Sequence, residues 1–194
     1  MAPVRDTPWG LEEDREVGPS PAGELLSLAA GSLAEGHTEA LDTIWDLCAR
    51  DLYGLALWRT GSTTDAEDAV QDVFLRLARF PRSLAQARRP RAYLLAMAHR
   101  AAVDALRRRP GALLESDPPL VAPDNDPERA ADAERASRLA DGLPAKQRTV
   151  LFLRLFAELS FADIGRVTGV ATFTAASRYR LAIRRLRKRM GVDS

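Results

Sequence analysis

Cysteine and histidine are scarce in this 194-residue chain, which has one cysteine, Cys48, and two histidines, His37 and His99. A lone cysteine forms no intramolecular disulfide, and Cys and His residues so few and so far apart do not assemble a Cys/His zinc site. Cys48 follows Leu47 in an apolar pattern, so we expect it to pack in the core. The sequence therefore predicts neither a metal nor a cofactor.

Long hydrophobic runs are also missing. No apolar stretch approaches the roughly 18 residues that cross a bilayer. Residues 1–6, MAPVRD, lack the basic-then-apolar order of a signal peptide. We therefore expect a cytoplasmic protein that does not insert into a membrane.

The sequence signatures of enzymes are absent as well. The carboxylates cluster on helix faces that we expect to be solvated, and no Ser/His/Asp or Cys/His order appears. No Gly-rich phosphate loop precedes a predicted helix. We therefore expect no catalytic residue and no small-molecule substrate.

Charge of both signs is abundant and strongly segregated. The net charge is only +1, yet residues 1–81 hold 15 acidic and 6 basic side chains. Residues 82–110, in contrast, hold 8 basic side chains and 1 acidic side chain. Residues 111–142 are acidic again, whereas residues 143–190 hold 11 basic and 2 acidic side chains. Two dense basic blocks favour a polyanionic partner such as nucleic acid.

The apolar pattern has helical period almost throughout. Alternation with period two is nearly absent, and Ala, Leu and Arg dominate, so the sequence predicts an all-α fold of two small helical domains. Pro- and Gly-rich composition predicts a flexible tail and a linker. The expected divisions are a tail at 1–23, a helical domain at 24–109, a Pro-rich linker at 110–127, and a second helical domain at 128–190.

Local signals place the helices of the first domain. Residues 23–59 predict one or two amphipathic helices. A capping box at Thr64 and Glu67 predicts the start of another, which Phe80-Pro81 ends. A basic loop at 81–90 and a helix over about 91–109 complete the domain. Asp126-Pro127-Glu128 predicts that a further helix restarts and runs to about residue 141.

The C-terminal pattern predicts a helix-turn-helix. Ser160 caps a short helix, Gly169 takes a positive φ at its end, and a long basic helix follows over about 172–190. A solvated basic helix in a bundle is the alternative interpretation. The residues expected to face duplex DNA are Thr172, Thr174, Ser177, Arg178, Arg180 and Arg184.

These motifs resemble those of a known family. Residues 64–77, TDAEDAVQDVFLRL, resemble the Asp-Ala-Glu-Asp-x-Val-Gln-Glu-Val-Phe signature of bacterial sigma factors of the extracytoplasmic-function (ECF) group. Residues 91–109 are similar to that family's next helix, and residues 143–151 and 159–164 resemble its fourth conserved region. The resemblance covers about 38–109 and 128–190. It implies a sigma factor that binds core RNA polymerase and directs promoter-specific transcription initiation.

The resemblance also implies roles for particular residues. The acidic helix would clamp the coiled coil of the largest polymerase subunit, through Asp65, Asp68, Gln71, Asp72, Leu75 and Arg76. The basic stretch that follows would hold the upstream-ten promoter element as a single strand, through Arg88, Arg89, Arg91, Tyr93, Arg100, Arg107 and Arg108. The helix-turn-helix would read the upstream-thirty-five element as duplex, and an anti-sigma factor is a further expected partner.

The chain departs from the family pattern at several positions. Tyr93 replaces the usual Trp, Arg100 replaces an Asn, and His99 stands where a basic residue is common. In the recognition helix, Phe173 replaces a small Gly, and residues 171, 175 and 176 are all alanine. These departures affect the predicted promoter preference more than the fold.

Two other functions remain open at this point. A sigma-like decoy that binds partners without initiating transcription would account for the altered recognition helix. A stand-alone helix-turn-helix regulator would bind DNA without polymerase, but it leaves the acidic helix at 64–79 unexplained.

Overall fold

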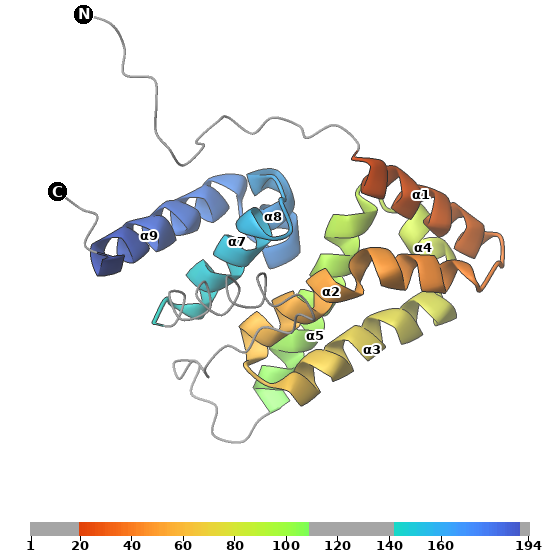
Figure 1. Cartoon of the computed structure of the whole chain (residues 1–194), viewed down its shortest axis with the longest axis horizontal. Coiled ribbons are helices and arrows are strands. Elements are labelled where there is room, and N and C mark those ends of the chain that lie inside the picture. The colour runs from red at the N-terminus through yellow and green to blue at the C-terminus, as the bar shows by residue number, and fades with distance from the viewer. Residues whose placement is uncertain (1–19, 109–141, 191–194) are drawn as a thin grey trace, which may run out of the picture.

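The computed structural model describes residues 20–108 and 142–190, and every regular element in these ranges is an α-helix. The predicted all-α fold is confirmed, with the helices gathered into two bundles (Figure 1). The predicted linker and the helix expected at 126–141 lie outside the described residues, as does most of the predicted tail. The first bundle holds α1 (Pro21–Ala34), α2 (Ala40–Thr60), α3 (Thr63–Arg79), α4 (Arg82–Ala85) and α5 (Pro90–Arg108); the second holds α7 (Ala145–Leu155), α8 (Phe161–Thr168) and α9 (Thr172–Met190).

The helix starts differ from the predicted ones in two places. Helix α1 begins at Pro21, inside the predicted tail, because Ser20 caps it by accepting a hydrogen bond from the Gly23 amide. The capping box predicted at Thr64 is wrong. Ser62 is the cap of α3, and its Oγ accepts from the Asp65 amide at 3.3 Å. Three hydroxyl residues stand in succession here, and only Ser62 has the extended backbone that a cap needs.

Other boundaries follow the expectation closely. Residues 23–59 form parts of two helices, α1 and α2, and Gly36 lies between them with a φ of 102°. Helix α3 ends at Arg79, directly before Phe80-Pro81, as predicted. The expected basic loop at 81–90 contains one short helix, α4.

The centre of the first bundle is the packing of α2, α3 and α5 on one another, with α1 and α4 beside them (Figure 1). The apolar side of α3 is buried in this core through Ala66, Ala69, Val70, Val73 and Leu77, and Phe74 is partly buried beside them. Cys48 is 3% exposed in this core, which confirms its predicted packing role. Burial raises the pKa of its thiol to about 12, so the reactive thiolate is not populated at neutral pH.

The two bundles share one continuous hydrophobic core, because α7 packs on α2 and α8 packs on α5. An aromatic cluster joins them. The ring centroid of Trp58 in α2 lies 5.3 Å from that of Phe152 and 5.4 Å from that of Phe156. Gly54 lets the helices approach, since a Cβ there would lie 3.0 Å from the Phe152 ring. This close packing of the bundles had no local signal in the sequence.

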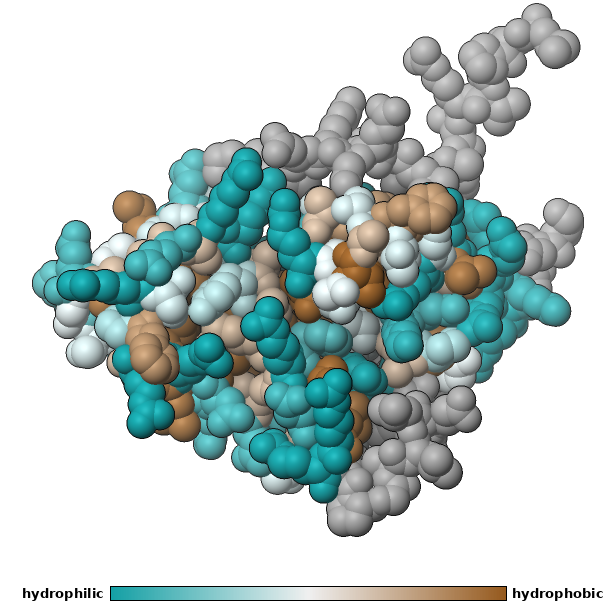
Figure 2. Space-filling view, turned by 180° about the vertical axis from the view of Figure 1, so that it is seen from behind, coloured by the Kyte–Doolittle hydropathy of each residue, from teal (hydrophilic) through white to brown (hydrophobic). Residues whose placement is uncertain are grey.

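The face seen in Figure 2 is largely hydrophilic, and hydrophobic residues appear on it as separate patches. Three large hydrophobic side chains are about 70% exposed: Leu28, Leu75 and Phe173. None of the described helices is long and apolar enough to cross a membrane.

Candidate nucleic-acid interface

Helices α8 and α9 form the predicted helix-turn-helix, and its turn is held by local chemistry. Ser160 caps α8 by accepting from the Asp163 amide at 3.1 Å. Gly169 ends the helix with a φ of 71°, which confirms the predicted left-handed residue. The chain then folds back so closely that a Cβ on Gly165 would lie 2.6 Å from the Val170 carbonyl oxygen. Residue 165 must therefore be glycine for α9 to leave α8 at this angle.

Helix α9 is basic along its whole length, with seven Arg or Lys residues and no acid. Its buried side consists of Ala175, Tyr179 and Ala182, which pack toward α7 and α8. Arg180 and Arg184 lie on the opposite side and are exposed. The arginine-rich side is therefore free of the core, as binding to phosphates and base edges requires.

The predicted duplex-binding residues do not all share that side. At about 100° per residue, Ser177, Arg180 and Arg184 point in nearly one direction. Arg178 is turned well away from it and is half-buried. Thr172 is exposed and Thr174 half-buried, and they flank the first turn of α9 on opposite sides.

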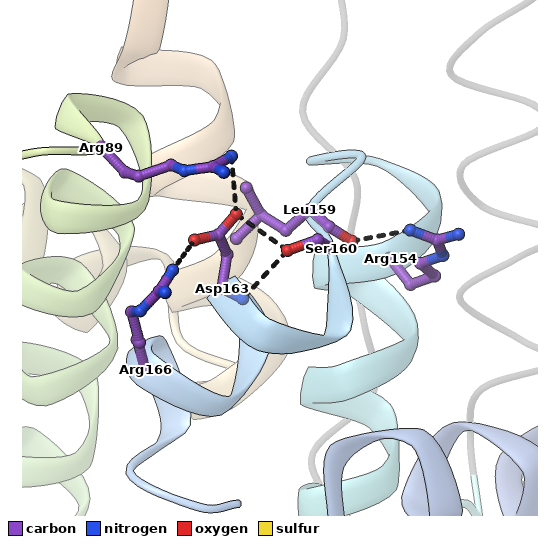
Figure 3. A network of polar contacts seen from close by, with 6 residues as sticks. All are labelled: Arg89, Arg154, Leu159, Ser160, Asp163 and Arg166. Atoms are coloured by element: carbon purple, nitrogen blue, oxygen red, sulfur yellow. Dashed lines mark hydrogen bonds and ion pairs between the residues drawn. The ribbon is translucent and has the colours of Figure 1, made fainter. Parts of the chain in front are cut away.

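Asp163 is the centre of a polar network that joins the two bundles (Figure 3). Its side chain is only 3% exposed and accepts from Ser160 Oγ at 2.9 Å and from Arg166. Arg89, from the first bundle, donates to the same carboxylate at 3.3 Å. Arg154 donates to the Leu159 carbonyl and holds the chain entering α8. Arg89, a predicted single-strand contact, is therefore engaged by the helix-turn-helix in this structure.

The other predicted single-strand contacts are spread from Arg88, just before α5, to Arg108 at its end. Arg91 pairs with Asp51 of α2 at 2.6 Å, with both side chains partly buried. Arg88 and Arg100 are exposed, and Arg107 lies 3.6 Å from Asp104. At 1.5 Å rise per residue, Arg107 and Arg108 lie on the order of 20 Å from Tyr93. The structure does not bring the predicted set to one place.

An open pocket of about 740 Å³ lies between the end of α1, the end of α3, and α4. Tyr93 lines it, together with the exposed ring of Phe80. Three arginines also line it, of which two, Arg79 and Arg82, were not predicted site residues. The third is Arg76, which was predicted to contact polymerase. Charge density in the sequence marked this region, but the convergence of two helix ends could not be read from it.

Helix α3 presents the predicted acidic side to solvent. Asp68, Gln71 and Asp72 are exposed, Leu75 is 68% exposed, and Asp65 is half-buried.

A hollow of about 430 Å³ lies beside the acidic side of α3, against α2. Trp45 and Tyr53 line it together with Gln71. Trp45 is 49% exposed and packs against Phe74, with ring centroids 4.8 Å apart. This surface combines carboxylates with a shallow apolar hollow, which suits a basic amphipathic helix of a protein partner.

His99 does not provide the positive charge common at its position in the family. Desolvation by burial, followed by the nearby charges of Arg59 and Arg100, lowers the pKa of His99 to about 4. The side chain is therefore neutral at neutral pH. The described residues also contain no group of three or more His, Cys, Asp or Glu side chains placed to hold a metal ion.

Comparison with known proteins matches both bundles. The family model of sigma-70 region 2 matches residues 44–110, and that of sigma-70 region 4 matches residues 139–188. The chain is 28% identical over 180 residues to the ECF RNA polymerase sigma factor SigK of Mycobacterium ulcerans, covering 88% of this chain and 96% of that protein. It is also 28% identical to the ECF sigma factor SigL of Mycobacterium tuberculosis over 160 residues, covering 79% of this chain and 90% of SigL.

Two solved structures share the fold. One is CnrH in complex with the cytosolic domain of CnrY, with a TM-score of 0.65 and 19% identity, over 88% of this chain and 99% of that one. The other is the sigma factor RpoE in complex with the anti-sigma factor NepR from Bartonella quintana. Its TM-score is 0.62 and its identity 22%, over 80% of this chain and 99% of that one.

Proposed function

Because this chain belongs to the sigma-70 family, in its ECF group, we propose that it binds core RNA polymerase and directs promoter-specific transcription initiation in the cytoplasm. The observation that carries this proposal is the presence of two different surfaces in one chain. The acidic side of α3 suits a basic protein partner, and the basic side of α9 suits duplex DNA. A stand-alone DNA-binding regulator has no use for the first surface.

The proposal assigns the contact with the largest polymerase subunit to α3. Asp68, Gln71, Asp72 and Leu75 form its exposed side, with Asp65 at the edge. Leu75 is a large apolar side chain left in solvent beside carboxylates, as expected at the centre of a docking surface with a charged rim. Arg76 lies at the boundary between this surface and the 740 Å³ pocket.

Binding of melted promoter DNA is assigned to that pocket and to the exposed arginines of α5. Single-stranded DNA is held by aromatic stacking within a basic groove. Phe80 and Tyr93 supply the rings, and Arg79 and Arg82 supply positive charge beside them. Arg88, just before α5, and Arg100, Arg107 and Arg108 along it extend the basic surface. Arg91 and Arg89 are held by ion pairs with Asp51 and Asp163, respectively.

The duplex upstream-thirty-five element is assigned to α9, through Ser177, Arg180 and Arg184, with Thr172 and Thr174 at the first turn. Arg178 is a weaker candidate because it is half-buried at the side of the helix. An anti-sigma factor is proposed as a further partner, since both structural neighbours were solved in complex with a second protein.

Run-off transcription tests the whole proposal. Purified chain mixed with core RNA polymerase is expected to yield discrete transcripts from a genomic fragment library, whereas either component alone yields none. Co-purification with core but no promoter-directed transcript would favour the decoy function. DNA binding without any affinity for core would favour the stand-alone regulator.

Reversing one charge on α3 is expected to weaken core binding selectively. Asp72→Lys places a cation within the acidic surface, and the affinity for core polymerase should fall at least tenfold, since like charges at a docked surface cost over 1 kcal/mol. Glu24→Lys, the same charge change at an exposed position of α1, is the matched control and should bind as the parent does. Fluorescence anisotropy with labelled chain measures both. Equal affinities for the two variants would remove α3 from the proposed interface.

A further inference from the structure

Phe173 is an aromatic side chain that the fold itself does not use. It is the second residue of α9 and is 73% exposed, the largest exposed fraction among the large hydrophobic side chains of the described residues. Leaving such a ring in water gains no burial energy. Its exposure leaves the ring available to a partner outside the fold.

The ring lies at the middle of the exposed side of α9. At about 100° per residue, Ser177, Arg180 and Arg184 point within about 40° of its direction. Ala175 and Ala182 point the opposite way and are fully buried. Phe173 thus begins the line of side chains that includes the best placed candidates for DNA contact.

Arg180 lies beside the ring. Its guanidinium carbon is 5.9 Å from the centroid of the Phe173 ring, which is within the range of a cation–π contact. The two residues are two helical turns apart on the same side. The ring and the guanidinium are therefore available to the same external surface.

The chemistry of that surface indicates which class of partner it suits. The first residues of a recognition helix enter the major groove and meet base edges. Among the groups displayed there, the 5-methyl of thymine is the apolar one, and aromatic or small apolar side chains pack against it. An arginine beside the ring suits an adjacent guanine or phosphate. Duplex DNA is also the occupant that the charge of α9 favours, since the helix carries no acid.

We propose that Phe173 is a specificity-determining residue that packs its ring against the 5-methyl group of a thymine in the duplex element read by α9. This proposal rests on the proposed function, because it deepens the role of the duplex-binding helix. Phe173 stands where the family has a small residue, and the replacement would make the protein require thymine at one base pair.

Replacing thymine with uracil tests the proposal, because it removes only the methyl group. Duplexes are first selected from a random pool with full-length chain bound to core polymerase. Each thymine of an enriched duplex is then replaced with uracil in turn. At one or two positions, uracil should weaken binding of the parent about threefold to tenfold. The Phe173→Ala variant should be insensitive to uracil at those positions.

Two controls accompany this measurement. Leu181→Ala removes another exposed apolar side chain of α9, one that lies about 80° around the helix from Phe173 and about two turns further along it, and it should keep the full uracil sensitivity. A duplex with cytosine at the sensitive position should bind the parent weakly. A duplex with 5-methylcytosine there should bind the parent more tightly, whereas Phe173→Ala should gain nothing from the methyl group. Thermal unfolding should be unchanged in both variants, since both side chains are exposed.

The outcomes separate the two proposals. If no duplex is enriched, the proposed function fails and Phe173 has no element to read. If a duplex is enriched but uracil affects the parent and Phe173→Ala equally, the thymine contact is overturned while the function stands. If Phe173→Ala instead abolishes a self-association seen by sedimentation, with no uracil effect, the ring serves a contact between copies of the chain and the proposal is wrong.

Discussion

Replacing Gly165 with alanine is expected to destabilise the helix-turn-helix by up to about 2 kcal/mol and to lower its affinity for duplex DNA. A Cβ at this position would lie 2.6 Å from the Val170 carbonyl oxygen and 3.4 Å from the Thr172 amide nitrogen. Both neighbours are backbone atoms, so no side chain can rotate away. Overpacking of this kind costs about 1 to 3 kcal/mol or more, which outweighs the roughly 1 kcal/mol that alanine gains in a helix.

Gly31→Ala provides the matched control for this substitution. Gly31 lies within α1, where an added Cβ would meet nothing within 4 Å. The same exchange is therefore expected to stabilise the protein by up to about 1 kcal/mol. Urea unfolding followed by circular dichroism measures both changes. If the two variants shifted the midpoint in the same direction, the close approach at Gly165 would not determine the angle between α8 and α9.

Acidification is expected to destabilise the protein through His99 by about 3 kcal/mol. The pKa of His99 is about 4 in the fold, below its ordinary value of 6.5. Between these two values the unfolded chain binds a proton that the folded chain does not. The stability is therefore fully present above about pH 6.5 and is lost as the pH falls toward about 4. The slope approaches 1.4 kcal/mol per pH unit, which is the linkage value for one proton.

A histidine-free variant isolates this contribution from that of the carboxylates. His99→Gln removes the titrating group, so its free energy of unfolding should change less between pH 7 and pH 4 than that of the parent. For each protein, the free energy of unfolding at pH 7 is the reference from which the change at pH 4 is measured. His37→Gln is the control, because His37 is 57% exposed and its loss should leave the difference intact. Parallel stability curves for parent and His99→Gln would show that the proton is not excluded from the folded state.

Features encoded by neighbouring residues could be predicted from the sequence. The Ser160 cap, the left-handed Gly169 and the start of α9 are each set within a few residues, and all three are observed. The cap of α3 was misplaced because Ser62, Thr63 and Thr64 are chemically equivalent in a pattern. Only the backbone conformation at Ser62 distinguishes them.

Features that depend on distant residues could not be predicted. Arg89 and Asp163 are 74 positions apart, and nothing local to either one marks the ion pair. Gly165 looked like an ordinary helical residue because the atoms it must avoid come from the following turn. The candidate single-strand contacts are grouped by the family resemblance and by charge, and the length of the 19-residue helix α5 separates them. Phe173 stood out as a departure from the family, but its exposure was needed to give it a role.

The packing of α7 and α8 on α2 and α5 has a consequence for the proposed function, in which each bundle binds one promoter element. The two promoter elements are about 25 base pairs apart, on the order of 85 Å at 3.4 Å per pair. A compact fold of this size is on the order of 40 Å across, so bundles joined through Trp58, Phe152 and the Arg89–Asp163 pair would have to separate to bind both elements. A polymerase that needs the separated form would bind only the fraction of chains already open. Each ~1.4 kcal/mol held in the shared core would then weaken its apparent affinity about tenfold.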